Sequence, residues 1–112
     1  MKPEQNCQGV GIFLTRNYEW MQPGQHYIAQ KYLHKPFLID GLKFDLRIYV
    51  LITGVSPLRC FIFKEGLARF ATVPYHTPNG LNLENMQMHL TNYAINKDTD
   101  KFISNTEGLG DT

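Results

Sequence analysis

The sequence of 112 residues has little cysteine and no long apolar segment. Its two cysteines, Cys7 and Cys60, lie far apart without C-x-x-C spacing, which argues against a disulfide framework and against a zinc site. No run approaches the roughly 20 apolar residues of a membrane-spanning helix, and the N-terminus lacks the apolar segment of a signal peptide. These absences predict a soluble protein of a reducing, intracellular compartment that has no membrane partner.

An excess of positive charge is also missing. Eleven Lys and Arg residues stand against ten Asp and Glu residues, so the formal net charge is +1. No overall field therefore draws the chain to nucleic acid, and any anion must be bound by local geometry. The aromatic residues Tyr49, Phe61 and Phe63 could imitate a base-stacking surface, but the RNP pattern is absent, so an RNA-binding module is a minor alternative.

Apolar residues make up 43% of the chain, which is enough to fill the core of a single small domain. Composition and turn signals predict strands over residues 12–15 and 27–33. The clearest pattern is an alternating strand over residues 44–53, and a turn followed by a second apolar stretch predicts an antiparallel hairpin over residues 44–63. We therefore expect a strand-rich fold with a sheet of four or five strands and one uncovered apolar face.

Regular helix is scarce in this pattern. A short helix is predicted through residues 85–88, with Asn82 as its cap. The segment from residue 98 to 112 is polar, and we expect it to be a mobile tail.

A glycine turn near the N-terminus is the first candidate site. Gly9-Val10-Gly11 before an apolar run usually marks only a turn, and neither a Walker loop nor a G-x-G-x-x-G fingerprint is present. Lys2 and Lys43 favour a phosphate loop, because either lysine could neutralise phosphate oxygens.

Charged residues of the predicted hairpin are the second candidate site. Asp45 and Arg47 share one strand face, either as a structural ion pair or as the floor of an active site. Arg69 could bind a carboxylate through two hydrogen bonds, or it could simply be solvated. Surface or packing roles are expected for the histidines, which show no metal-ligand spacing: His26, His34, His76 and His89.

Six blocks of residues occur in an order typical of one enzyme family. They are Lys2-Pro3, Cys7–Phe13, Gln30–Leu33, Leu38–Val50, Glu65–Thr72 and Met88–Lys97. The Lys-Phe-Asp-Leu-Arg run at 43–47 and the His-Leu-Thr-Asn-Tyr run at 89–93 are together highly specific. Over nearly all of residues 2–97, the chain resembles the central part of a polyglutamylase of the tubulin tyrosine ligase-like family.

This resemblance implies a partial ATP-grasp fold of the α+β class, a strand-rich central portion with an antiparallel hairpin. Residues 1–97 would belong to the ligase domain. The implied reaction joins glutamate to tubulin: ATP activates a carboxylate as an acylphosphate, the amino group of free glutamate attacks it, and Mg²⁺ offsets the phosphate charge. Tubulin or microtubules and free glutamate are the implied partners, and the cytoplasm and cytoskeleton, including cilia or basal bodies, are the implied locations.

The resemblance also implies roles for individual positions. The implied ATP contacts are Lys2, the phosphate loop Gln8, Gly9, Val10, Gly11, Ile12 and Phe13, the adenine hinge Gln30, Lys31, Tyr32 and Leu33, and Lys43, Asp45, Thr91 and Asn92. Arg47 would stabilise charge at the transferred phosphoryl group, so that Lys43, Asp45 and Arg47 form the catalytic set. Arg69 would take the carboxylate of the incoming amino acid, with Tyr93 and Ala94 in the same pocket.

Three departures from the family pattern bear on activity. Val10 replaces a basic residue, which predicts weaker ATP binding. Ala94 replaces the serine of glutamylating members, so a glycine-adding ligase is an alternative. The family's acidic strand, with its metal-binding aspartate and Glu-x-Asn pair, has no counterpart before residue 112, so Mg²⁺ ligands are expected beyond that residue and none within this chain.

The chain alone is therefore predicted to be an inactive fragment. One alternative is a truncated, non-catalytic paralogue that binds tubulin or nucleotide. Another is an unrelated, small β-rich binding domain.

Overall fold

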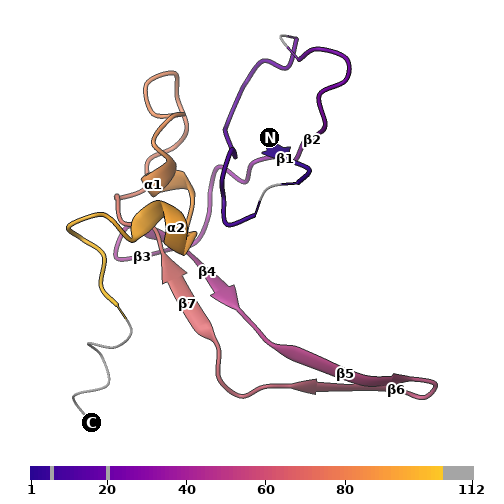
Figure 1. Ribbon diagram of the computed structural model, residues 1–112. Helices are drawn as coiled ribbons and strands as arrows, with labels where there is room; N and C mark the ends of the chain where they lie inside the picture. Colours follow the sequence, from indigo (N-terminus) through magenta and orange to yellow (C-terminus); the bar gives the residue numbers. More distant parts are fainter. Residues whose placement is uncertain (6, 20, 105–112) are drawn as a thin grey trace.

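The computed structural model describes residues 1–5, 7–19 and 21–104. Within them the chain forms seven short strands followed by two single-turn helices (Figure 1). Every strand pair is antiparallel, and the strands form three small sheets with the orders β1-β2, β3-β4-β7 and β5-β6. This strand-rich arrangement agrees with the expected α+β class. The expected sheet of four or five strands is wrong for the described residues, because each ladder stops after a few pairs.

A long two-stranded ribbon extends away from the helices (Figure 1). Its strands are β4 (Leu42–Arg47) and β5 (Val50–Val55) on the way out, and β6 (Leu58–Ile62) and β7 (Leu67–Phe70) on the way back. The outer pair, β5 and β6, is joined by a tight turn through Ser56-Pro57, so the hairpin predicted for residues 44–63 is confirmed for residues 50–62. Residues 44–47 of that prediction pair instead with β7. The short β3 (Leu38–Ile39) pairs with the start of β4.

The ribbon is interrupted between its inner and outer halves. The prediction of one continuous strand over residues 44–53 is wrong, because Ile48-Tyr49 belong to no strand. They face the longer segment Phe63–Gly66, which cannot stay in register with them, although the Phe63 amide still donates to the Tyr49 carbonyl at 3.0 Å. Gly66 passes so close to the opposite strand that a Cβ there would lie 2.6 Å from the Arg47 carbonyl oxygen, so the position requires glycine.

Apolar side chains of the outer hairpin are largely exposed. A two-stranded ribbon carries no second layer over either of its faces, so residues of both faces meet solvent. The exposed apolar residues of β5 and β6 are Val50, Leu51, Ile52, Val55, Leu58, Phe61 and Ile62.

The N-terminal segment folds back on itself. β1 (Lys2–Pro3) pairs with β2 (Tyr27–Ile28), and Met1 and Phe13 exchange two backbone hydrogen bonds of 2.9 and 3.1 Å. The Phe13 ring packs edge-on against Tyr27.

Two strand predictions for this segment are wrong. Residues 12–15 form no strand, because Phe13 alone pairs with the chain start. The strand predicted over 27–33 contains only Tyr27-Ile28, since β1 offers only two residues for pairing and Tyr32 turns inward to contact His89.

The core lies where the end of β7 meets the helices α1 (Met86–His89) and α2 (Tyr93–Asn96). Its largest fully buried side chains are Met88, His89 and Asn96. Two of these three are polar, so the core depends on hydrogen bonds as well as on apolar burial.

Asn82 does not cap the first helix. The helix begins at Met86 after Asn85, and the Asn82 side chain accepts from the Asn79 amide at 2.8 Å and donates to the Thr77 carbonyl at 3.1 Å. The prediction of Asn82 as the cap is therefore wrong. Asn82 instead closes the turn that precedes the helix, a common role of Asn side chains.

The segment after α2 contacts that helix within the described residues. The Thr99 hydroxyl donates to the Asn96 carbonyl at 2.8 Å, and the Phe102 ring packs edge-on against Tyr93. Residues 105–112 of the predicted tail lie outside the described residues, so its mobility stays a prediction.

Candidate functional site

A cavity of about 1040 Å³ lies between the N-terminal segment, the inner ribbon and the loop before α1. Its lining comes from parts of the chain that are far apart in sequence, among them Lys2, Lys31, Lys43 and Asn92. A cavity of this size lies at the upper end of the range found for small-molecule and cofactor sites, roughly 300–1,000 Å³.

Nine of the predicted ATP contacts line this cavity. They are Lys2, Ile12, Phe13, Gln30, Lys31, Tyr32, Lys43, Asp45 and Asn92. The other predicted ATP contacts are not part of its lining: Gln8, Gly9, Val10, Gly11, Leu33 and Thr91. The geometry thus gathers residues of five of the six sequence blocks around one space, and the individual roles remain predictions.

The glycine loop adjoins the cavity through Asn92. Gly9 is buried at φ +82°, and a Cβ there would lie 3.1 Å from the Asn92 Cγ atom. A side chain at this position would therefore be strained in its backbone and would also push Asn92 away. Val10 is more than half exposed, so its side chain stands clear of this contact.

Positive charge dominates the cavity lining. Lys2, Arg16, Lys31 and Lys43 come from four different segments, and Asp45 is the only acidic residue among the lining residues. The Arg16 guanidinium also donates to the Pro78 carbonyl at 2.8 Å. This charge balance suits an anionic ligand, although the chain as a whole is nearly neutral.

Lys43 is held at the cavity wall by three contacts. Its Nζ donates to the His89 carbonyl at 2.9 Å and to the Tyr32 hydroxyl at 3.4 Å, and it lies 4.5 Å from the centre of the Tyr32 ring. Burial lowers the pKa of Lys43, and the Asp45 carboxylate partly opposes that shift. A poorly hydrated ammonium group of this kind binds an anion with little further loss of water.

His89 lies behind this lysine and is fully buried. Its Nε2 is 2.8 Å from the Asn82 carbonyl oxygen and its Nδ1 is 2.7 Å from the Tyr32 hydroxyl. Burial, together with the nearby Lys43 charge, lowers the pKa of His89 although the Asn82 contact opposes this, so the ring is neutral at pH 7. A packing role was expected for this histidine, but its sequence position gave no sign of the contact with Tyr32.

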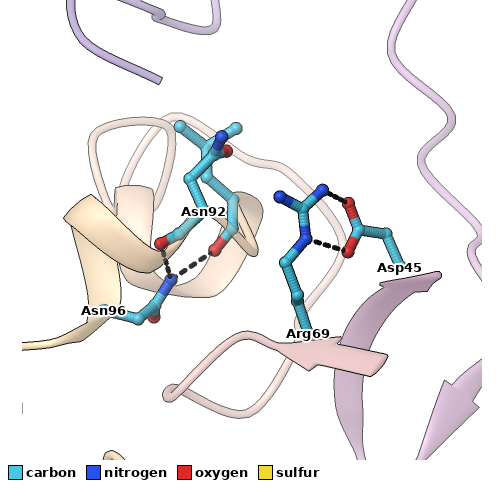
Figure 2. Close-up of polar contacts among 5 residues, drawn as sticks. Asp45, Arg69, Asn92 and Asn96 are labelled. Carbon is cyan, nitrogen blue, oxygen red and sulfur yellow. Dashed lines mark hydrogen bonds and ion pairs between the residues drawn. The ribbon is translucent and has the colours of Figure 1, made fainter. Parts of the chain in front are cut away.

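Asp45 and Arg69 form a two-bond ion pair across β4 and β7. The two residues are directly opposite in the register, and Arg69 Nε donates to one Asp45 oxygen at 2.8 Å while Nη2 donates to the other (Figure 2). Burial raises the pKa of Asp45, but hydrogen bonds from Arg69 and its charge outweigh this and hold the pKa below its usual value. Two interpretations from the sequence are thereby corrected: the ion-pair partner of Asp45 is Arg69 rather than Arg47, and Arg69 is not simply solvated.

A second cavity, of about 700 Å³, lies on the other side of this pair. Arg69, Thr91 and Tyr93 line it, whereas Asp45 lines the first cavity. The ion pair therefore stands between the two cavities. Of the remaining predicted residues, Ala94 and Arg47 line neither of them.

Asn96 holds the segment that carries Thr91 and Asn92. Its Nδ2 donates to the carbonyls of Leu90 at 2.9 Å and Asn92 at 3.1 Å, as Figure 2 shows. Its Oδ1 accepts from both the amide and the hydroxyl of Thr72. Sequence reasoning missed this residue, although it lies within the Met88–Lys97 block.

Comparison with known proteins identifies the family of the chain. The model of the tubulin-tyrosine ligase family matches residues 1–108. The chain belongs to this family. The resemblance inferred from the six sequence blocks is thereby confirmed.

Several curated members of the tubulin-tyrosine ligase family are similar to the chain over most of its length. Tubulin polyglutamylase TTLL13 of Mus musculus is 61% identical over 91% of the chain, which covers 13% of that protein. A probable beta-tubulin polyglutamylase of Tetrahymena thermophila is 57% identical over 96% of the chain and 9% of its own length. Tubulin polyglutamylase TTLL6 of Mus musculus is 56% identical over 91% of the chain and 12% of its own length. The chain thus spans about a tenth of the length of these relatives.

Metal-binding side chains do not cluster in the described part of this family member. No three His, Cys, Asp or Glu side chains among the described residues lie close enough together to hold a metal ion. Across the same residues, no helix has the length and apolar character needed to cross a membrane.

Proposed function

We propose that this chain forms part of the ATP and amino-acid site of a ligase that adds glutamate to tubulin. The names of the curated relatives support the reaction class. The observation that carries the proposal is the cavity of about 1040 Å³, around which the fold gathers Lys2, Lys31 and Lys43. Such a cluster in an otherwise neutral chain is suited to a polyphosphate.

ATP, when bound, supplies the phosphoryl group that activates the acceptor carboxylate. Lys2 and Lys43 would offset the negative charge of its phosphates, and Gln30–Leu33 would provide the wall for adenine. Arg47 follows Asp45 by two residues in β4, so the two project from the same face of the strand. From there Arg47 would stabilise charge at the transferred phosphoryl group.

The incoming glutamate would bind through Arg69. The Nε and Nη2 donors of Arg69 form the fork that recognises a carboxylate, and Asp45 occupies this fork in the structure. A guanidinium has five N–H donors, and the contact with Asp45 uses only Nε and one proton of Nη2. The α-carboxylate of glutamate would bind the other edge of Arg69, formed by Nη1 and the second Nη2 proton, while Asp45 holds the guanidinium in place.

Activity would require more than these residues. The family's acidic strand, with its metal-binding aspartate and Glu-x-Asn pair, has no counterpart in residues 1–112, so we propose that Mg²⁺ ligands lie beyond residue 112 and that residues 1–112 alone incorporate no glutamate. The partners would be tubulin or microtubules and free glutamate, without nucleic acid or membrane. The locations would be the cytoplasm and cytoskeleton, including cilia or basal bodies.

The test is the incorporation of labelled glutamate into microtubules by the full-length protein with ATP. Lys43→Ala should lower the rate by about 100-fold or more, because a charge aimed at the phosphates is removed. Lys35→Ala is the matched control, since Lys35 is exposed and outside the cavity lining, and it should leave the rate unchanged. Equal rates for Lys43→Ala and the control would refute the proposed site.

Two other outcomes identify the remaining alternatives. Incorporation of glycine in place of glutamate would identify a glycine-adding ligase, the alternative suggested by Ala94. Nucleotide binding without any transfer by the full-length protein would identify a non-catalytic binding module, an alternative that Val10 also favours.

A further inference from the structure

His89 lies in direct contact with two predicted ATP contacts, Tyr32 and Lys43, but has no role in the proposed reaction. It is one of the largest fully buried side chains of the described residues, and it belongs to α1 rather than to the cavity lining. Its ring contacts Tyr32 at 2.7 Å and its backbone carbonyl accepts from Lys43 at 2.9 Å.

The hydrogen-bond directions in this cluster follow from the Asn82 carbonyl. A carbonyl oxygen can only accept, so the Nε2 atom of His89 carries the proton and donates to it across 2.8 Å. In the neutral ring Nδ1 is then an acceptor, and the Tyr32 hydroxyl must be its donor. The lone pairs of the Tyr32 oxygen are left for the Lys43 ammonium at 3.4 Å.

The ammonium group of Lys43 is thus fixed by one residue in two ways. His89 accepts from it directly through the backbone, and the His89 ring sets the direction of the Tyr32 hydroxyl that also accepts from it. Without an acceptor at Nδ1, the Tyr32 hydroxyl could turn its proton toward Lys43 and repel the ammonium. Both contacts hold Lys43 at the wall of the cavity of about 1040 Å³.

We propose that His89 is a positioning residue for nucleotide binding, which acts by fixing the Tyr32 hydroxyl and, through it, the Lys43 ammonium. The proposal rests on the proposed function, since it takes the ligand of this cavity to be a nucleoside triphosphate. A purely structural role would instead depend on the bond from His89 to Asn82, which ties α1 to the preceding loop.

Two substitutions separate these roles. His89→Asn places an amide oxygen near the position of Nδ1, so it keeps an acceptor for Tyr32 but loses the donor to Asn82. His89→Gln places an amide nitrogen near the position of Nε2, so it keeps the donor to Asn82 but loses the acceptor. If His89 acts through Tyr32, the His89→Gln variant should bind nucleotide more weakly, and the His89→Asn variant should not.

The measurement is the Kd of the full-length protein for a fluorescent, ribose-labelled ATP analogue, with the unfolding temperature recorded for each variant. His89→Gln should raise the Kd about tenfold, the usual effect of one lost hydrogen bond to a charged group, while His89→Asn should stay within about twofold of the unchanged protein. A weaker binding of the analogue by His89→Asn than by His89→Gln would overturn the proposal. His76→Gln is the matched control, because His76 is exposed and lies outside the cavity lining.

Tyr32→Phe keeps the proposal falsifiable if both His89 variants fail to fold. It removes only the hydroxyl between His89 and Lys43, and it should raise the Kd about tenfold. In combination with His89→Gln it should add little, because the two changes break the same path. Unchanged binding by Tyr32→Phe would overturn the proposal.

Lys43→Ala separates this proposal from the proposed function. Loss of binding by Lys43→Ala with normal binding by His89→Gln would overturn the positioning role alone. Normal binding by both variants would overturn the nucleotide site itself.

Discussion

The inner and outer halves of the ribbon are held in different ways. The outer hairpin, β5 and β6, has the most strand pairs, with one register shift between Ile52 and Gly54, yet its apolar side chains are exposed. The inner half, β4 and β7, has fewer pairs, but it carries the Asp45–Arg69 ion pair and leads into the buried contacts of Asn96. The comparison shows that the number of backbone pairs does not decide where the site forms: the site is positioned by side-chain hydrogen bonds.

Removal of the Asn96 amide should have the largest effect on this comparison. Asn96→Ala would leave the Thr72 amide and the carbonyls of Leu90 and Asn92 without this partner in a buried setting. We expect a loss of about 3 kcal/mol in the free energy of unfolding, measured by chemical denaturation. Asn17→Ala is the control, because its exposed amide accepts only from the Glu19 backbone, and it should cost less than about 0.5 kcal/mol. Similar losses for both would contradict the central role of Asn96.

A methyl group at Gly66 should disrupt the junction between the inner and outer halves of the ribbon. Gly66→Ala would place a Cβ 2.6 Å from the Arg47 carbonyl oxygen, so the backbone must shift, at a cost of about 1–3 kcal/mol. Denaturation together with amide exchange should show faster exchange on both sides of the junction. Nothing lies within 4 Å of the corresponding Cβ at Gly80, so Gly80→Ala should be nearly neutral. Unchanged exchange in Gly66→Ala would show that the junction tolerates the shift.

Arg69→Lys should have a smaller effect that depends on pH. Lysine cannot form the two-bond fork, and because the Asp45 side chain is 41% exposed, solvent limits the loss of stability to about 0.5–1 kcal/mol. The folded-state pKa of Asp45 is lowered, so this stabilisation is complete above the unfolded-state pKa of about 4 and is lost as the pH falls through the folded-state pKa.

The measurement is the difference in the free energy of unfolding between the protein and the Arg69→Lys variant across pH 2 to 7. The difference should be full near neutral pH and should vanish in acid. Arg59→Lys is the control, since Arg59 lies over the Phe61 ring and forms no ion pair with a carboxylate of the described residues. A difference that persists at the acid end would contradict the assignment to Asp45.

The tip of the outer hairpin should show the smallest effect. Val55 is 82% exposed, so Val55→Thr should change the free energy of unfolding of residues 1–112 by less than about 0.5 kcal/mol. The same change in the full-length protein sharpens the comparison. A clearly larger loss there would show that another part of the protein covers the hairpin.

The outer hairpin could be predicted from the sequence because it depends on local pattern, whereas most of the site residues follow only from the resemblance to the family. Alternating apolar residues and a Pro-containing turn define β5 and β6 without reference to the rest of the chain. The partner of Asp45 could not be predicted, because it depends on the register that the Phe63–Gly66 segment sets between β4 and β7. From sequence spacing alone, the expected ion-pair partner of Asp45 is therefore Arg47, its near neighbour in the chain.

The contacts between distant segments were the least predictable part. Tyr32 and His89 are brought together only by the fold, and the two-residue β1 limits β2 in a way that strand composition cannot show. The helix α2 is a single turn, too short for a periodic signal. The sequence therefore gives no sign of the four side-chain hydrogen bonds of Asn96.

Because the lysines around the larger cavity come from distant parts of the chain, a ligand that binds two of them links those parts. Lys2 belongs to the first strand and Lys43 to the fourth, and the intervening chain contacts the rest of the fold through a few residues, among them Gly9, Arg16 and Tyr32. A polyanion that touches both lysines closes a loop of about 40 residues and removes much of the freedom of that loop, as a cross-link does. Ligand binding should therefore stabilise the packing of the N-terminal segment against the rest of the fold, and that packing should in turn favour ligand binding.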